Sequence, residues 1–278
     1  MRWAVSHRTT FRYGGSVSHN FNEVRLRPAD IPEQRLEYFY LATSPSATVE
    51  HHLDFYGNWV DRFEVFEPHT LLETRSQAVV ETRPPPLLPE DAAPVPLARI
   101  GEAAQNEHCY DFLQPSRFTD TDPATGRLAR EAAAGQTDVW QAALALMRFV
   151  HGRLEYQSCS THVHTPMREV LAQGRGVCQD FAHVMIGLCR SAQIPARYVS
   201  GYLATESASA THAWTEVFIP TIGWRALDPT HIRQPDESYV KIAVGRDYDD
   251  VPPLRGTYRG TLSRRMEVDV RITPAPRL

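Results

Sequence analysis

A proline-rich stretch is the feature that most limits how this 278-residue chain can fold. Residues 84–96 contain six prolines, which lack a backbone N–H and can neither continue a helix nor occupy a central strand. The stretch therefore predicts an extended linker. It divides the chain into an N-terminal unit at 1–83 and a C-terminal unit at 97–278. Two units also agree with the usual domain size of about 100–200 residues.

The N-terminal unit has the alternating pattern of β-strands. Apolar and polar side chains alternate from Trp3 to Tyr13, which is typical of a strand with one buried face. Similar segments occur at 37–41, 59–66 and 71–82. Residues 54–58 have the composition of a turn. A series of short strands without a helical segment predicts a β-sandwich or another β-rich domain.

The C-terminal unit mixes helical and strand patterns, so we predict the α+β fold class. Helices are expected at 138–150 with Gly152 as the stop, at 166–174 with Thr165 as N-cap, and from Val177 onward. Strands are expected at 197–203, 212–218 and 224–228, and again at 266–272. A turn at 220–223 makes the strands on either side of it antiparallel.

Charge and cysteine content exclude several classes of protein. The formal charge is −4, from 29 basic and 33 acidic residues, whereas nucleic-acid-binding proteins usually carry a basic excess. No apolar run reaches the roughly 18–20 residues that span a bilayer, and the N-terminal residues do not form a signal-peptide core. Four scattered cysteines are too few for a disulfide scaffold. We expect a cytoplasmic chain with free thiols and with no nucleic-acid or membrane partner.

Cys178 is the leading candidate for a reactive residue. It follows Gly174-Arg175-Gly176-Val177 and opens the third expected helix, where the helix dipole and unpaired backbone N–H groups favour a thiolate. The glycines allow a sharp turn that leaves the sulfur uncrowded. For the thiol alone, a small core residue that begins a helix is the simpler explanation.

A nucleophilic thiol needs a base, and the base needs a group that orients it. His212 lies on an expected strand, and the return strand ends at Asp228, within about two residues of the position opposite His212. Side chains on paired strands are close enough for a carboxylate to bind an imidazole. Cys178, His212 and Asp228 therefore form a coherent catalytic set. Considered separately, His212 is also explained as a core histidine and Asp228 as a strand-end cap.

Three sequence blocks resemble the core of bacterial transglutaminase-like proteins. They are Gly174–His183 with its continuation Ile194–Tyr202, His212–Val217, and Gly223–Thr230. Residues 22–28 and 54–58 resemble the β-rich domain that precedes this core in one bacterial subgroup. The resemblance implies a papain-like α+β core with a helix-borne cysteine packed on an antiparallel sheet. It implies Cys178 as nucleophile, His212 as general base and acid, and Asp228 as the orienting group, with no cofactor.

Acyl transfer also requires hydrogen-bond donors for an oxyanion. The backbone N–H of Cys178 at the helix start is the natural first donor, and the candidates for a second donor are Tyr156 and Gln157. For Tyr156, an amphipathic core residue is the simpler explanation. His183 and Trp214 are candidates for lining the site, although core packing explains both.

Two further groups suggest metal ligation without completing a site. The segment Cys159–His164 contains one cysteine and two histidines, fewer ligands than a zinc site requires. Asp247, Asp249 and Asp250 lack the turn glycine and distal glutamate of a calcium loop. We therefore predict no metal. The remaining cysteines, interpreted as structural, are Cys109 and Cys189.

The sequence favours an enzyme that cleaves or transfers the acyl group of a peptide or protein amide through a thioester. Hydrolysis needs only water as acceptor, and we favour it for that reason. The alternatives are a cross-linking transglutaminase that uses an amine acceptor, and a non-catalytic binding or scaffold protein that keeps the fold. Lys241 is the only lysine, so the chain offers few amines of its own.

Overall fold

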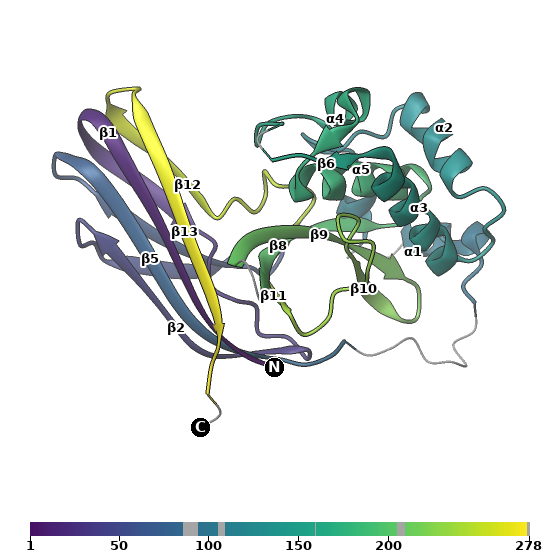
Figure 1. Ribbon diagram of the computed structural model, residues 1–278, viewed down its shortest axis with the longest axis horizontal. Helices are drawn as coiled ribbons and strands as arrows, with labels where there is room; N and C mark the ends of the chain where they lie inside the picture. Colours follow the sequence, from purple (N-terminus) through teal and green to yellow (C-terminus); the bar gives the residue numbers. More distant parts are fainter. Residues whose placement is uncertain (86–93, 105–108, 159, 205–208, 277–278) are drawn as a thin grey trace.

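The computed structural model describes residues 1–278 except 86–93, 105–108, 159, 205–208 and 277–278 (Figure 1). The longer strands are β1 (Arg2–Val24), β2 (Gln34–Ser44), β3 (Val49–Leu53), β4 (Trp59–Val65), β5 (His69–Thr82), β8 (Ala196–Ala204), β9 (Ser209–Ile219), β10 (Gly223–Leu227), β11 (Tyr239–Gly245), β12 (Leu254–Gly260) and β13 (Arg264–Pro274). Two-residue strands are β6 (Glu155–Tyr156) and β7 (Arg175–Gly176). The helices are α1 (Gly101–Ala104), α2 (Pro123–Ala132), α3 (Val139–Arg153), α4 (Met167–Gln173) and α5 (Cys178–Ser191), with 3₁₀ turns at Leu97–Arg99 and Tyr110–Leu113. Within the described residues, none of these helices combines the length and the apolar character needed to cross a membrane.

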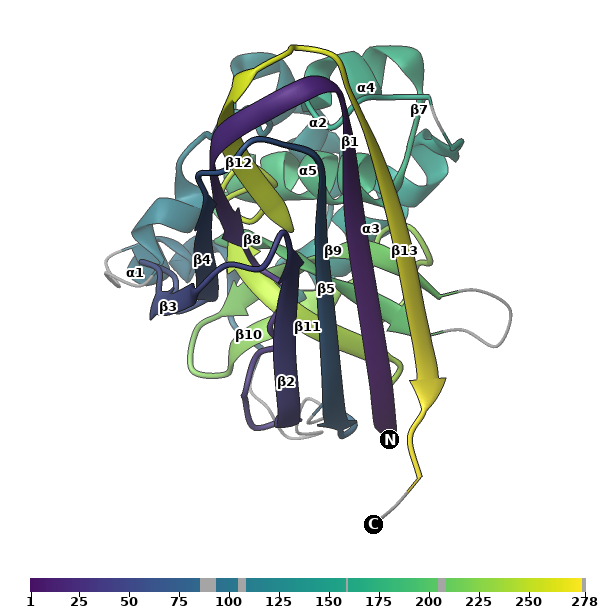
Figure 2. The same cartoon turned by 90° about the vertical axis from the view of Figure 1, so that its left-hand side faces the viewer.

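The 23-residue strand β1 organises the N-terminal part. Its first half pairs with β5 on one side and β13 on the other, and its second half pairs with β4 and β12. Between the halves the pairing with β5 changes register after Arg12, and the chain passes through Gly14 and Gly15. The strand bends there, so one seven-stranded antiparallel sheet folds over itself (Figure 2). The expected β-rich domain is confirmed, and its two layers belong to one continuous sheet.

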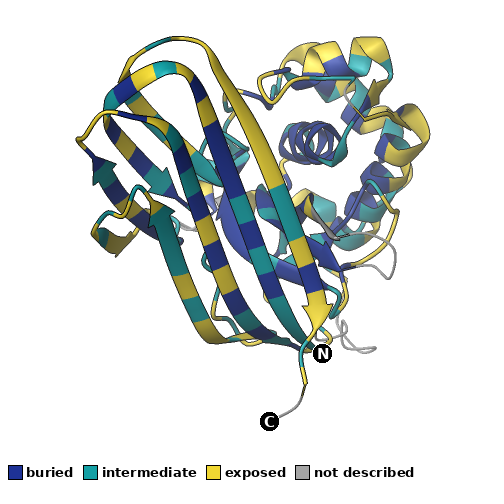
Figure 3. Cartoon of the chain, turned by 60° about the vertical axis from the view of Figure 1, so that its left-hand side comes forward, coloured by how far each residue is buried: buried dark blue, intermediate teal, exposed yellow. Residues whose placement is uncertain are grey.

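A small apolar core fills the inside of this folded sheet. Phe11, Tyr13 and Leu72 from one layer pack with Val24 and Phe63 from the other. Buried and exposed residues alternate along the long strands, as Figure 3 shows. This alternation is why the strands were recognisable in the sequence.

The two C-terminal strands join the N-terminal sheet. β12 pairs with the second half of β1, and β13 pairs with its first half. Both strands follow the linker at 84–96 in the sequence, so the division of the chain at this linker placed them in the C-terminal unit. Val5 and Ile272 are partners across the β1–β13 pairing, and both are buried. The sheet is therefore built from both ends of the chain (Figure 1).

The C-terminal part has the expected α+β architecture. Its antiparallel sheet has the order β10-β9-β8-β11, and α5 packs on β8 and β9. Helices α2, α3 and α4 pack around α5. Every residue of α5 from Gln179 to Arg190 is buried, as expected of a helix that is enclosed on all sides (Figure 3). The prediction of a helix-borne cysteine on an antiparallel sheet is confirmed.

The two parts share one hydrophobic core. Val5, Val80 and Ile272 of the N-terminal sheet belong to the same buried cluster as the side chains of α3 and α5. The side chain of Asn58 exchanges two hydrogen bonds of 2.8 Å with the backbone of Val244. Because apolar surface is buried between them, the two parts pack against each other instead of being connected by the chain alone.

The described end of the linker is attached to α3. The N–H of Val95 donates to Asp138 Oδ2 at 2.9 Å, and the N–H of Leu97 donates to the carbonyl of Thr137 at 2.7 Å. Asp138 is also the N-cap of α3, since its other oxygen accepts from the N–H of Gln141. Residues 86–93 of the expected linker lie outside the described residues.

Helix ends follow the sequence signals in part. Gly174 ends α4 in a left-handed conformation with φ 68°, as expected, while Pro166 rather than Thr165 is the N-cap of that helix. The expectation that Gly152 ends α3 is wrong, because α3 continues to Arg153. Glycine is compatible with helical dihedral angles, so a glycine alone does not stop a helix.

Two glycine substitutions should change stability in opposite directions. A Cβ on Gly201 would meet the carbonyl oxygen of Val240 and lie 2.5 Å from Cη2 of Trp214, so Gly201→Ala should lower the free energy of unfolding by about 1–3 kcal/mol. A Cβ on Gly152 would meet nothing within 4 Å, so Gly152→Ala should raise it by about 0.5–1 kcal/mol. Urea denaturation measures both changes. A Gly201→Ala variant as stable as wild type would contradict the close packing around β8.

Candidate active site

The segment before α5 presents Cys178 at the start of the helix. Gly174 turns the chain, and β7 carries it back toward α5. A Cβ on Gly176 would lie 2.6 Å from Cβ of Asp180, so a side chain does not fit there. Asp180 Oδ2 accepts a hydrogen bond of 2.7 Å from the N–H of Val177, the residue just before the helix. These contacts fix the first turn of α5 and leave the thiol of Cys178 half-buried.

Strands β9 and β10 bring His212 and Asp228 together. β10 pairs with β9 as far as Leu227 and Thr215, and Asp228 follows directly. His212 Nε2 lies 2.8 Å from Asp228 Oδ2. Nδ1 is the ring nitrogen left for the hydrogen bond between His212 and the side chain of Cys178. The structure therefore places the three residues of the expected catalytic set in one chain of hydrogen bonds.

The surroundings of His212 favour its charged form. Burial disfavours the imidazolium, but the hydrogen bonds with Asp228 and Cys178 raise the pKa of His212 to about 9. Burial also opposes the charge of Asp228, but hydrogen bonds, led by that from His212, hold the pKa of this carboxyl far below its usual range. At neutral pH the pair is an imidazolium held by a carboxylate. The sulfur of Cys178 thus has an imidazolium and a helix N-terminus beside it.

Two further side chains bind the carboxylate of Asp228, and sequence reasoning missed both. His231 Nδ1 lies 2.9 Å and the Tyr239 hydroxyl 2.6 Å from Asp228 Oδ2, while Arg233 Nε donates to the Tyr239 oxygen at 2.8 Å. His231 follows Asp228 by three residues, which is a signal present in the sequence. Tyr239 lies on β11, which no local pattern indicated, and comes near Asp228 only because β11 pairs with β8. Together these partners keep Asp228 ionised beside His212.

Cys178 and His212 line a cleft of about 470 Å³ between the two parts of the molecule. On the core side the lining includes Tyr156, Gln179, Tyr198 and Tyr248. On the opposite side it includes His7 and Thr9 of β1, and Met266 and Val268 of β13. The N-terminal sheet is therefore one wall of the cleft. Sequence reasoning missed this wall because it arises from the packing of the two parts.

The two candidates for a second oxyanion donor differ in position. Tyr156 lines the cleft, and burial together with the neighbouring Cys178 raises the pKa of its phenol. The side chain of Gln157 accepts a hydrogen bond of 3.3 Å from Arg175 Nη1 and is not among the described residues that line the cleft. Tyr156 is therefore the better placed of the two.

The two candidates for lining the site lie behind its surface. His183 is fully buried, its Nε2 accepts from the N–H of Tyr248 at 3.2 Å, and burial lowers its pKa to about 3. Trp214 is also buried, with its ring centroid 6.2 Å from that of His212. Neither is among the described residues that line the cleft, so both act on it only through the side chains they support.

The groups considered for metal ligation are engaged elsewhere or exposed. Cys159 lies outside the described residues, and His162 and His164 are exposed. The acidic residues have protein partners: Asp247 accepts from the N–H of Phe118, Asp249 pairs with Arg117 and Arg255, and Asp250 pairs with Arg246. Within the described residues, one group of three potential ligands lies close together, namely His212, Asp228 and His231, in which both histidines already hydrogen-bond to Asp228.

Cys109 and Cys189 have the surroundings of structural residues. Both are fully buried. Burial raises the pKa of the Cys109 thiol to about 11 and that of the Cys189 thiol to about 12. They therefore stay protonated at neutral pH.

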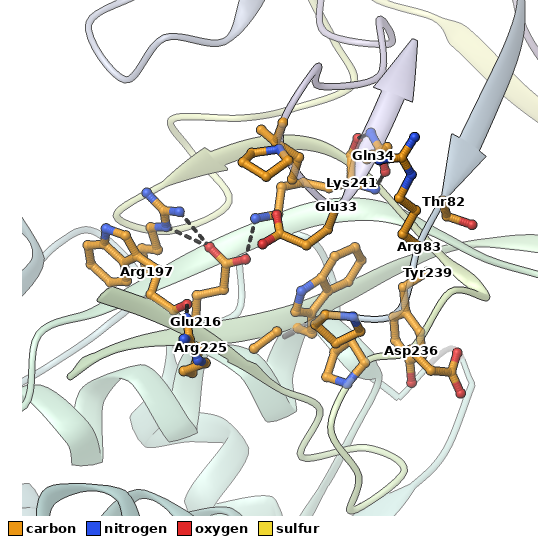
Figure 4. A pocket seen from close by; sticks show the side chains of 17 residues that line it. Glu33, Gln34, Thr82, Arg83, Arg197, Glu216, Arg225, Asp236, Tyr239 and Lys241 are labelled. Atoms are coloured by element: carbon orange, nitrogen blue, oxygen red, sulfur yellow. Dashed lines mark hydrogen bonds and ion pairs between the residues drawn. The ribbon is translucent and has the colours of Figure 1, made fainter. Parts of the chain in front are cut away.

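A second cavity, of about 360 Å³, contains the only lysine of the chain (Figure 4). Glu216 lies between Arg197, whose Nη2 is 2.7 Å away, and the ammonium group of Lys241. Burial opposes the charge of Glu216, but the two cations lower its pKa to about 2. The amine of Lys241 is therefore held in an ion pair, in this cavity rather than in the cleft of Cys178.

The sequence and fold are shared with known proteins. Residues 126–229 match the transglutaminase-like superfamily, and residues 3–81 match the bacterial transglutaminase-like N-terminal region. The uncharacterized protein ML0607 of Mycobacterium leprae is 32% identical over 280 residues, which cover 98% of each chain. The uncharacterized protein Mb2599c of Mycobacterium bovis is 35% identical over 301 residues, which cover 98% of this chain and 93% of that protein. The chain belongs to the transglutaminase-like superfamily and carries the bacterial N-terminal region of that family.

Two other similarities concern proteins with a described activity. A crystal structure reported as "a Putative Cysteine Protease from Cytophaga hutchinsonii" superimposes with a TM-score of 0.80 at 25% identity, covering 100% of this chain and 92% of that one. A protein-glutamine gamma-glutamyltransferase of Pseudomonas aeruginosa is 36% identical over 102 residues, which cover 31% of this chain and 15% of that protein. Transglutaminase-like proteins are generally cysteine-dependent enzymes.

Replacing Asp228 with asparagine should lower the pKa of His212. The variant keeps the size of the side chain but loses its charge, so burial becomes the dominant influence and the pKa should fall from about 9 to below the ordinary value of 6.5. NMR titration of the His212 ring measures this. His231→Gln, which removes a different partner of Asp228, is the control and should leave the pKa of His212 above its ordinary value. An unchanged pKa in Asp228→Asn would contradict the role given to the carboxylate.

Proposed function

We propose that this protein hydrolyses an amide by transferring its acyl group first to Cys178 and then to water. One observation carries the proposal: a half-buried thiol at a helix start is hydrogen-bonded to His212, whose other nitrogen lies 2.8 Å from a buried carboxylate. Such an arrangement supplies a nucleophile with an acid beside it. The substrate class that follows is a peptide, isopeptide or other carboxamide, and the chemistry needs no cofactor.

The first half of the proposed reaction forms a thioester. The Cys178 thiolate attacks the carbonyl carbon, so that a C–S bond forms and the carbonyl π electrons move to oxygen. When this intermediate collapses, the C–N bond breaks and His212 gives its proton to the nitrogen, which leaves as an amine.

The second half restores the enzyme. His212, now neutral, takes a proton from water as the water oxygen attacks the thioester carbon. The C–S bond then breaks, the carboxylic acid leaves, and the thiolate and imidazolium are both restored. Asp228 holds the imidazole in one orientation through both halves, because its carboxylate stays ionised.

Two donors are proposed for the oxyanion. The N–H of Cys178 lies in the first turn of α5, where backbone N–H groups have no acceptor within the helix. The hydroxyl of Tyr156 is the proposed second donor, because it lines the cleft close enough to Cys178 for the two groups to influence each other. A donor of this type typically lowers the barrier by about 2.7–4 kcal/mol. Gln157, bound to Arg175, is the weaker candidate.

Water is the proposed acceptor because it reaches the thioester without a second binding site. Transfer to an amine is the second candidate, and the similarity of 102 residues to a protein-glutamine gamma-glutamyltransferase supports it. That transfer would need an amine from another molecule, since the ammonium of Lys241 is paired with Glu216.

A panel of amides should separate these outcomes. Wild type and Cys178→Ala are incubated with peptide, γ-glutamyl and isopeptide amides, with and without added cadaverine. The masses of the products are measured by mass spectrometry. We expect at least one class to yield the free acid in wild type, and we expect Cys178→Ala to lose about 10³-fold or more of the rate. Amine adducts in place of the acid would favour the second candidate. If wild type and Cys178→Ala cleaved the amides at equal rates, or if neither cleaved any of them, the result would contradict the proposal.

Amide cleavage should fall as the pH rises through about 9. His212 must be protonated to release the amine, and its pKa is raised to about 9, so this acid is present below that pH and lost above it. The measurement is kcat/KM against pH for an amide and for the p-nitrophenyl ester of the same acyl group. The ester is the control, because its leaving group needs no proton. If kcat/KM fell with pH in the same way for the amide and for the ester, the result would argue against His212 as the acid.

A further inference from the structure

The cleft at Cys178 is uncharged apart from its reactive pair. Although Asp, Glu, Lys and Arg make up 22% of the sequence, none of them is among the described residues that line the cleft. The imidazole of His7 is neutral at pH 7, because burial lowers its pKa to about 4. A charged group moved from water into this lining would lose hydration without gaining a partner.

Strand β13 contributes an apolar surface to the N-terminal wall of the cleft. Met266 and Val268 lie two residues apart, and therefore on the same face of β13, and both line the cleft. They are 58% and 49% exposed, so their side chains are free to contact a bound molecule. Leu254 of β12 lies in the same wall.

The cleft continues into a second hollow of about 250 Å³ with a different character. The residues shared by the two are Val163, Tyr248, Leu254 and Met266. Beyond these shared residues the hollow is lined by aromatic side chains, among them Phe11 and Tyr13, and by polar and charged ones, among them Asn20 and Arg264. Among the described residues, the groove therefore runs from a stretch without charged side chains of Asp, Glu, Lys or Arg at the thiol to an end where aromatic, polar and charged side chains are mixed.

We propose that this groove binds the acyl group of the substrate, and that the segment next to the scissile carbonyl is uncharged and apolar. The inference rests on the proposed function, because the acyl group is the part that stays on Cys178 after the amine leaves. Met266 and Val268 contact this segment and determine specificity for it. The N-terminal sheet is thereby a part of the substrate site and not only a support for the core.

Alkylating reagents with different tails test the groove without a known substrate. Iodoacetamide, N-hexyl-iodoacetamide and N-carboxymethyl-iodoacetamide all form the same S–CH₂ bond with loss of iodide. Their rates at Cys178 are measured by intact mass, and each is divided by the rate of the same reagent with 2-mercaptoethanol. We expect the hexyl reagent to react about 10-fold faster than iodoacetamide, because its tail is buried, and the carboxymethyl reagent to react more slowly.

Variants of β13 show whether Met266 and Val268 cause the faster reaction of the hexyl reagent. Val268→Asp and Met266→Gln should reduce the ratio of the hexyl rate to the iodoacetamide rate, measured within each variant, to about 2-fold or less. Glu267→Gln, which lies between them on the opposite face of β13, is the matched control and should keep the full advantage. A thermal melt shows that each variant is folded.

The outcomes separate this inference from the proposed function. Equal normalised rates of the three reagents with wild type would overturn the inference and leave the proposed function standing. A loss of hexyl preference in Glu267→Gln as large as in Val268→Asp would also overturn it. If Cys178 reacted with none of the reagents faster than 2-mercaptoethanol, the proposed function would fail, and the inference with it.

Discussion

The buried carboxylate of Asp228 is the group on which the candidate site depends. Its Oδ2 accepts from His212, His231 and Tyr239, and its Oδ1 accepts from the N–H of Thr230 at 2.8 Å. A charge in the protein interior is tolerated only when donors of this kind surround it. Because the negative charge is fixed there, His212 keeps its proton at neutral pH in spite of burial. The imidazolium lies beside Cys178.

The position of Cys178 depends on a second constraint, the enclosure of α5. The helix is buried from Gln179 to Arg190 between the sheet and helices α2, α3 and α4, so its first residue is held at the edge of the core. The N-terminal sheet then meets the core along the opening in front of that residue. The same strand, β1, builds the N-terminal sheet, shares its apolar side chains with the core, and lines the cleft through His7 and Thr9.

Local patterns predicted the elements that carry the reactive groups. The glycines before Cys178 and the turn at 220–223 act over a few residues, so their effects could be derived without a structure. The predictions that failed concern helix ends. Gly152 does not stop α3, because helix length depends on what the helix packs against. The pairing of the C-terminal strands β12 and β13 with β1 was outside what the sequence could predict, because sequence order does not specify a strand's neighbour.

By itself the sequence determined the local chemistry of this protein: a thiol at a helix start, and a histidine near an aspartate across a hairpin. Backbone geometry fixes such spacings, because helices and strands have constant periods. Only the tertiary structure decided that Tyr239 reaches Asp228, that Lys241 is paired with Glu216, and that β1 and β13 form a wall of the cleft. These contacts join different strands and loops, and no local sequence pattern links the residues that make them. They result from burial of apolar surface, which is non-directional and leaves no periodic signal in the sequence.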